Sequence, residues 1–174
     1  MTPPPDGVLA RMRAATRELH DRLESKTLGD RIMDGSLTVE EYRRLTRWQE
    51  RVHHALEPKL AGFSVGEYRY RPRYPLAEGE SRPADLPEAL GIAYVLEGSS
   101  LGGSMIYQKL RANPNLASEA PFPFYRGQAE SGVKQWRALA RELAQLQLSE
   151  KETERAAESA RRAFLRFEQE WDAA

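Results

Sequence analysis

Apolar residues recur along this chain at the three- and four-residue spacing of amphipathic helices. The first such stripe follows Val8 and consists of Leu9, Met12, Thr16, Leu19 and Leu23. A second helix is expected to begin at a capping box formed by Thr38 and Glu41 and to run to about Leu60, near Pro58 and Gly62. Both patterns are typical of helices that bury one face.

Three further helices are expected in the second half of the chain. They cover Leu86–Leu110, Gly127–Leu146, and a last segment from a Ser149/Glu152 capping box to about Trp171. No alternation typical of β-strands persists anywhere. The pattern therefore predicts an all-α fold, a single-domain multi-helix bundle over residues 8–174. The proline-rich residues 1–7 are expected to be a disordered N-terminal tail.

Composition narrows the class of function. The chain has 174 residues, with 26 Lys+Arg balanced by 26 Asp+Glu, so a nucleic-acid partner is not expected. It has no cysteine, which excludes disulfides, iron–sulfur clusters and thiolate ligation of heme. No apolar run reaches the roughly 18–20 residues of a membrane span, and the first residues lack the apolar core of a signal peptide. We therefore expect a cytoplasmic protein without a membrane contact.

The basic helical stretch Arg11–Glu24 carries one imidazole, His20. On a helix, Glu24 lies one turn after His20, and Arg13 and Arg17 lie on nearby faces. An axial heme ligand needs a neutral imidazole, a group that holds its second nitrogen, and cations for the propionates. This segment offers all three. A solvated charged face beside an apolar stripe explains the same residues, so the segment alone leaves both interpretations open.

The second unusual stretch is Gly91–Gly103, with glycines at 98, 102 and 103. Gly98 and Gly102 share one helix face, and each glycine inside a helix costs about 0.5–1 kcal/mol relative to alanine. The stretch lacks the Lys-Ser/Thr of a phosphate-binding loop. Close approach of a ligand and close packing of another helix both account for the glycines. Tyr94, one turn before Gly98, is placed to reach the same face.

Together these motifs resemble a known family. The run T-x-x-x-H-x-x-x-E at Thr16, His20 and Glu24 looks like the proximal helix of heme oxygenases, and YVLEGSSLGG at residues 94–103 looks like the distal helix of the bacterial, biliverdin-producing branch. Weaker similarities run through DGSLTVEEYRRL, FPFYRG followed by Trp136, and SARRAFLRFEQEW. The resemblance covers nearly the whole chain, and it implies the heme-oxygenase-like helical fold.

The resemblance also implies roles for particular residues. His20 is implied as the axial ligand of heme iron, the one metal ligand from the protein, and Glu24 as the group that orients it. The implied heme-binding residues are Arg13, Thr16, Arg17, His20, Glu24, Tyr94, Gly98, Gly102, Gly103 and Phe164. The implied catalytic set is His20, Gly98, Ser99 and Gly102. Ser99 stands where the mammalian-type enzymes carry an aspartate, so proton delivery is expected to use ordered water and backbone groups.

The implied reaction is oxidative cleavage of heme b to biliverdin, carbon monoxide and ferrous iron, with biliverdin IXα as the expected isomer. Heme is both substrate and cofactor, and dioxygen is consumed. Electrons come from an external donor such as ferredoxin, an NADPH-dependent reductase or ascorbate. The implied partners are therefore heme, a redox partner protein and, as one acceptor of biliverdin, a bacterial phytochrome.

Two other interpretations remain open at this point. Glu50 and His53 form an E-x-x-H pair, the ligand spacing of non-heme di-iron oxidases, although such a site needs two pairs and further carboxylates. The second alternative is a catalytically silent heme-oxygenase-like domain that binds heme or another tetrapyrrole.

Overall fold

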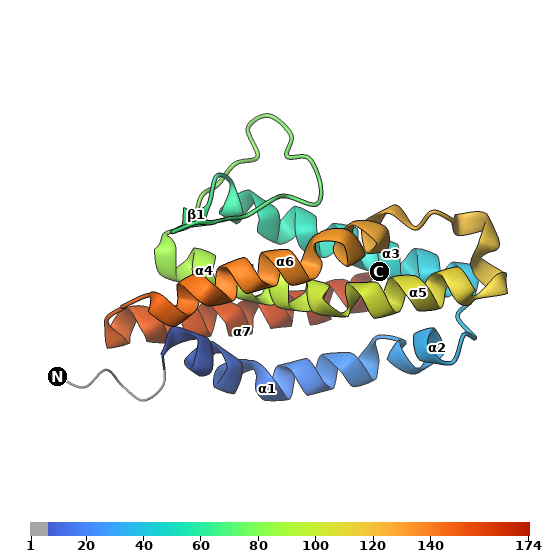
Figure 1. Ribbon diagram of the computed structural model, residues 1–174, viewed down its shortest axis with the longest axis horizontal. Coiled ribbons are helices and arrows are strands. Elements are labelled where there is room, and N and C mark those ends of the chain that lie inside the picture. Colours follow the sequence, from blue (N-terminus) through green and yellow to red (C-terminus); the bar gives the residue numbers. More distant parts are fainter. Residues whose placement is uncertain (1–6) are drawn as a thin grey trace.

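The computed structural model describes residues 7–174, which form the all-α fold that the sequence predicts. The disordered tail was predicted for residues 1–7, and all of these residues except Gly7 lie outside the described part of the chain. The α-helices are α1 (Val8–Lys26), α2 (Gly29–Met33), α3 (Val39–Leu56), α4 (Leu86–Ser99), α5 (Gly103–Ala112), α6 (Pro123–Gln145) and α7 (Glu150–Ala173) (Figure 1). Short 3-10 helices are η1 (Glu57–Leu60), η2 (Ser100–Gly102) and η3 (Pro114–Glu119), and strands β1 (Ser64–Val65) and β2 (Tyr68–Arg69) form a hairpin.

Both predicted capping boxes are confirmed. At the start of α3, the Glu41 amide donates to Thr38 Oγ1 at 3.2 Å, and the Thr38 amide donates to a Glu41 carboxylate oxygen at 2.9 Å. Ser149 and Glu152 repeat this arrangement at the start of α7, with distances of 3.1 and 2.9 Å. Each box satisfies amides that have no partner within the helix, and so it fixes where the helix begins.

Other boundaries differ from the predictions. α6 begins at Pro123, four residues before the expected start, because proline suits the first turn of a helix, where its missing N–H costs nothing. α3 ends at Leu56, and the chain continues to Leu60 as the 3-10 helix η1.

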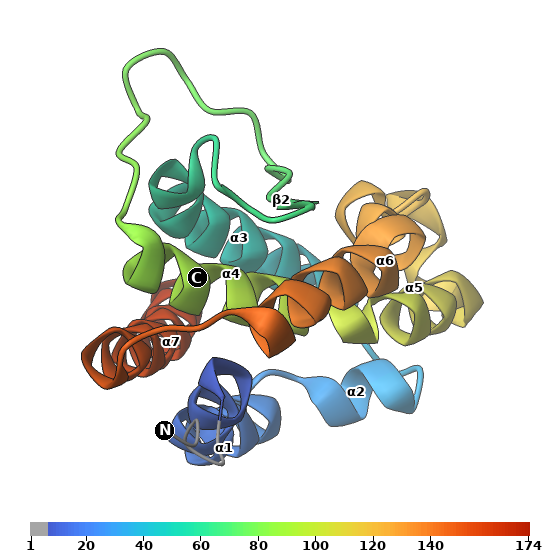
Figure 2. The same ribbon diagram turned by 60° about the vertical axis from the view of Figure 1, so that its left-hand side comes forward.

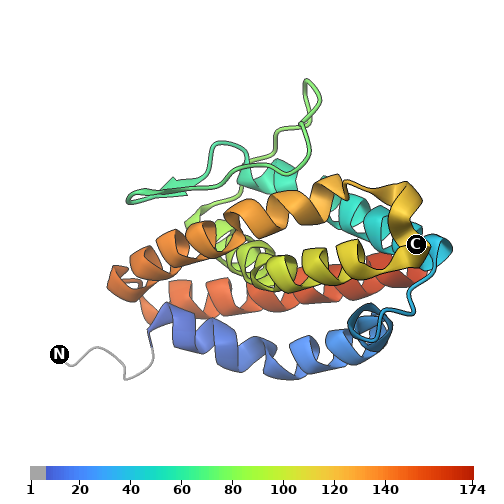
Figure 3. The same cartoon turned by 45° about the vertical axis from the view of Figure 1, so that its right-hand side comes forward.

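The single helix expected over Leu86–Leu110 is interrupted. α4 ends at Ser99, η2 follows, and α5 starts at Gly103, so the glycine-rich stretch forms a bend between two helices (Figure 3). Ser100 contributes to the interruption, because its Oγ donates to the Glu97 carbonyl at 2.6 Å. Such a hydroxyl-to-carbonyl bond competes with the regular backbone ladder and often bends a helix.

α1 and α4 both pack along α7, and α6 packs against α5 (Figure 1). At the α4–α7 crossing, a Cβ on Gly91 would lie 2.5 Å from the Ala156 carbonyl oxygen and 2.6 Å from the Ala160 amide nitrogen. Only glycine allows this approach of the two backbones. α3 joins the core through Trp48, whose indole N–H donates to the Phe167 carbonyl at 2.7 Å. The bundle therefore has one continuous core.

The connector between η1 and α4, residues 61–85, loops out beside α3 (Figure 2). Its tyrosines Tyr68 and Tyr70 are nevertheless buried in the main core, so the connector is part of the same domain. Within residues 7–174, no helix has both the length and the apolar character needed to cross a membrane.

Candidate functional site

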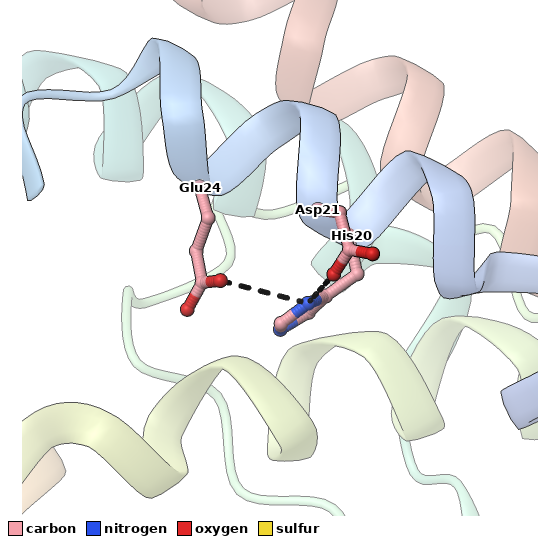
Figure 4. A group of neighbouring side chains, drawn as sticks. All are labelled: His20, Asp21 and Glu24. Carbon is pink, nitrogen blue, oxygen red and sulfur yellow. Dashed lines mark ion pairs between the residues drawn. The ribbon is translucent and has the colours of Figure 1, made fainter.

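His20 projects from α1 with two carboxylates beside it (Figure 4). Its Nδ1 lies 3.5 Å from Asp21 Oδ1 and 4.0 Å from Glu24 Oε2. Both carboxylates approach the same ring nitrogen, which leaves Nε2 available to a ligand. All three side chains are exposed and project toward the ribbon of the α4–α5 segment. The arrangement places acidic groups near one ring nitrogen and leaves the other free, as a ligating imidazole requires.

The nearer of the two carboxylates belongs to Asp21, which sequence reasoning missed, although its position next to His20 was a usable signal. The potential ligand atoms of His20, Asp21 and Glu24 all lie within 4.8 Å of one another. These residues form the one group of three or more potential metal ligands within residues 7–174. Phe164 of α7 makes a T-shaped contact with the His20 ring, with centroids 6.0 Å apart.

Two cations on the same helix are free of protein partners. Arg13 and Arg17 are exposed and form no ion pair within residues 7–174. By contrast, Arg11 pairs with Glu154 of α7 and Arg22 pairs with Glu168. Arg13 and Arg17 are therefore the guanidinium groups of α1 that can meet an external anion.

Thr16 is buried, and its hydroxyl donates to the Met12 carbonyl at 2.7 Å. This bond lies within α1 and gives Thr16 a packing role, because the hydroxyl proton is already committed. Its predicted contact with heme gains no support from this placement.

The glycines of the second stretch divide into two kinds. A Cβ on Gly98 would meet nothing closer than Trp136 Cζ3 at 3.7 Å, and one on Gly102 nothing closer than Ile106 Cδ1 at 3.8 Å. Gly103 differs, because a Cβ there would lie 2.6 Å from the Gln128 Cβ of α6. Gly98 and Gly102 thus leave space open, whereas Gly103 lets α5 pack closely on α6.

The open glycines lie on an apolar, exposed surface. Leu101 is 41% exposed and Met105 is 53% exposed, and both are close to Gly102 along the chain. Tyr94, half-buried one turn before Gly98, packs at a tilt against Trp136 of α6 with centroids 5.7 Å apart. Trp136 is a further site residue, and its only sequence signal was the weak similarity around FPFYRG. Leu101 and Met105 can therefore offer apolar contact to a ligand beside Gly102.

The two serines after Gly98 have committed protons. Ser99 Oγ donates to the Leu96 carbonyl at 2.8 Å, and Ser100 Oγ donates to that of Glu97. The exposed Ser99 oxygen can still accept a hydrogen bond, so it can orient a water molecule but does not readily donate a proton.

Glu50 and His53 do not form a metal site. His53 is fully buried, its Nδ1 is 2.7 Å from the Gln49 carbonyl, and Tyr74 and Phe124 surround its ring. Glu50 is exposed on another face of α3. Burial lowers the pKa of His53 to about 4, as expected of a neutral core histidine. The di-iron interpretation is therefore not supported by the structure.

The candidate site is an open surface between helices. Cavities of about 220 and 440 Å³ lie elsewhere, one between the connector and α6 and the other among α3, α4 and α7. Neither is lined by His20, Gly98 or Gly102. The site thus combines an exposed imidazole, two arginines without ion-pair partners in residues 7–174, and apolar side chains next to the glycines Gly98 and Gly102.

The comparison with protein families agrees with this geometry. A family model described as heme oxygenase matches residues 6–74 and 72–172. No curated protein matches the chain significantly.

Proposed function

Since this chain belongs to the heme oxygenase family, we propose that it cleaves heme b oxidatively to biliverdin, carbon monoxide and ferrous iron. The observation that carries the proposal is the exposed His20 on α1, whose side chain projects toward the segment that leaves Gly98 and Gly102 uncovered. Heme iron needs an accessible imidazole as its ligand, and the flat ring needs a helix surface without protruding side chains.

The residues present fit a flat, apolar and dianionic group. Gly98 and Gly102 offer helix surface without side chains, and Leu101 and Met105 offer apolar contact. His20 would hold the iron through Nε2, with Asp21 and Glu24 beside Nδ1 to favour the correct orientation. Phe164 would limit rotation of the imidazole. When bound, heme supplies the iron that activates dioxygen.

The propionates need cations at the edge of the site. Arg13 and Arg17 are the unpaired guanidinium groups of α1, and Arg13 with Tyr94 is the pair that would set the seating of the ring. A Ser99 that accepts a hydrogen bond would order water near the bound ligand. The chain's contribution to the reaction is orientation and steric restriction, without a side-chain nucleophile.

The remaining parts of the proposal follow from the family. Dioxygen and electrons must come from outside, through ferredoxin, an NADPH-dependent reductase or ascorbate. A redox partner protein and a biliverdin acceptor such as a bacterial phytochrome are proposed on the same basis. The cytoplasmic location stays a prediction.

Titration with hemin tests the proposal. We expect a Soret band typical of histidine-ligated heme at a one-to-one ratio, followed by bleaching to biliverdin when ascorbate or a reductase is added. A stable Soret band without bleaching would identify a silent heme-binding domain. Absence of any His-ligated spectrum would contradict the heme proposal altogether.

A further inference from the structure

A buried ion pair lies directly behind the open glycines. Glu97 of α4 is fully buried, and the guanidinium of Arg73, from the connector, donates to its carboxylate. The Arg73 side chain is only 11% exposed. Glu97 immediately precedes Gly98 and is the sole fully buried charged residue of α4. Such a pair is costly to desolvate, so apolar residues of similar volume would serve stability equally well or better.

Arg73 is itself fixed to the core. The buried carboxylate of Glu57 accepts the Arg73 backbone amide at 2.7 Å and the Tyr70 hydroxyl at 3.0 Å. Arg73 also donates through Nη1 to the Arg71 carbonyl at 3.1 Å. Burial, followed by the charge of Glu97, raises the pKa of Tyr68, so this neighbouring hydroxyl stays protonated. The connector therefore presents the guanidinium to Glu97 in one fixed position.

Glu97 also lies in the last turn of α4, just before η2. Its carbonyl accepts both the Ser100 amide and the Ser100 hydroxyl, and these bonds begin η2. The Ser100 carbonyl in turn lies against α6, where a Cβ on Gly132 would be 2.5 Å from its oxygen. The bend is thus held at Glu97 on one side and at Gly132 on the other.

We propose that Arg73 and Glu97 are positioning residues that fix the bend between α4 and α5, and thereby set how closely the Gly98–Gly102 segment approaches a bound ligand. Neither side chain belongs to the ligand surface. The bend itself does not depend on the proposed function, but its consequence for heme does.

Hydrogen exchange in the heme-free protein tests the bend. Glu97→Gln keeps the size of the side chain but removes its charge, so the ion pair with Arg73 is lost. We expect the amides of residues 98–104 to exchange about tenfold faster or more, because a hydrogen bond to a charged group is lost. Amides in the middle of α7 should not change. Glu88→Gln is the matched control in the same helix, because Glu88 pairs with Lys59 at the exposed end of α4. Unchanged exchange at residues 98–104 in Glu97→Gln would overturn the proposal.

The heme complex supplies the second measurement. In Glu97→Gln, the pH midpoint of the acid–alkaline spectral transition of ferric heme should move by roughly half a unit or more, since the distal backbone is displaced. An unmoved midpoint together with faster exchange would reduce the pair to a structural role and overturn the positioning claim. If the wild type binds no heme, the proposed function fails, and the exchange experiment alone still decides on the bend.

A second variant covers a failure to fold. Arg73→Met combined with Glu97→Met removes both charges and should fold, yet show the same fast exchange at residues 98–104. If this double variant folds with wild-type exchange, the pair does not hold the bend. If neither variant folds, the pair is a requirement of the whole fold, which also overturns the proposal.

Discussion

The ring of Phe164 stands edge-on to the imidazole of His20, with 6.0 Å between their centroids. Because α1 packs along α7, this contact links the orientation of His20 to the core helix of the bundle. The carboxylates of Asp21 and Glu24 lie near Nδ1 of the same imidazole. His20 is therefore exposed, with an aromatic ring and two carboxylates as neighbours that restrict its orientation.

Replacement of His20 tests its role as the axial ligand. His20→Ala should lose the His-ligated Soret spectrum and weaken hemin binding about tenfold or more, because even the outer partners of a ligand contribute that much. His54→Ala is the control, since His54 is also exposed but lies on α3. An unchanged spectrum in His20→Ala would assign the ligand to another histidine.

The glycines should separate into packing and ligand positions. Gly91→Ala should lower the free energy of unfolding by about 1–3 kcal/mol, because its Cβ would strike the α7 backbone. Gly102→Ala should keep or raise stability by roughly 0.4–1 kcal/mol, since its φ of −76° suits alanine and the space is open. Urea unfolding measures both differences.

Biliverdin formation, in contrast to stability, should be sensitive to a side chain at Gly102. Gly102→Leu should keep its helical circular dichroism but lose most biliverdin formation, because its side chain would fill the surface that the ring needs. If Gly102→Leu forms biliverdin at the wild-type rate, the open space at this glycine is not where the substrate binds.

The helices themselves were predictable from sequence, because their signals are local. The capping boxes at Thr38 and Ser149 depend on residues three apart, and the structure confirms both. The bend at Ser100 was not predicted. It involves the packing of Ser100 against Gly132 and, in our proposal, the ion pair between Arg73 and Glu97. Such contacts join segments that are distant in sequence, so periodicity does not reveal them.

The candidate site also contains residues that local spacing predicts and residues that only tertiary packing reveals. His20 and its neighbour Glu24 follow from helix spacing, and the structure places them side by side. Gly98, Gly102 and Gly103 were all expected to contact heme, and the packing against α6 sets the buried Gly103 apart from the other two. Trp136 and Arg73 reach the site region from separate segments; only the weak similarity around FPFYRG pointed to Trp136, and nothing in the sequence pointed to Arg73.

His53 should make the protein less stable in acid. Burial lowers its pKa to about 4, below the value of 6.5 that is usual for histidine, so the unfolded chain binds the proton more readily. The stability that His53 contributes is therefore complete above pH 6.5 and is lost as the pH falls toward 4. Between pH 7 and pH 5 the loss should be about 2 kcal/mol.

Urea unfolding at both pH values measures this loss, and His53→Leu should remove it. His54→Leu, the exposed neighbour, serves as the control. Burial raises the pKa of Glu57, which gives the opposite sign: its contribution is present at low pH and is lost as the pH rises. The difference between wild type and His53→Leu cancels that background. An equal pH dependence in the two proteins would contradict the prediction.

The position of ring cleavage should depend on Arg13. A tight site exposes one edge of the ring to bound oxygen, so the anchoring of the propionates selects the meso carbon that is cut. Arg13 is exposed and forms no ion pair within residues 7–174, and the resemblance to heme oxygenases implies that it anchors the propionates together with Tyr94 in the seating that is cut at the α-meso carbon. We therefore expect biliverdin IXα from the wild type.

Arg13→Ala should give a mixture of isomers. A hydrogen bond between charged groups contributes roughly 1.5–3 kcal/mol before solvent screening, so its loss can shift the balance between two seatings of the ring by about tenfold. Arg22→Ala is the matched control on α1, because Arg22 already forms an ion pair with Glu168.

Lys109 of α5 is the cation that would support a rotated seating of the ring. Chromatography of the isomers decides: a mainly β or δ product from the wild type would contradict the anchoring by Arg13 and Tyr94, yet it would leave the heme oxygenase proposal intact, since every isomer requires cleavage of the ring.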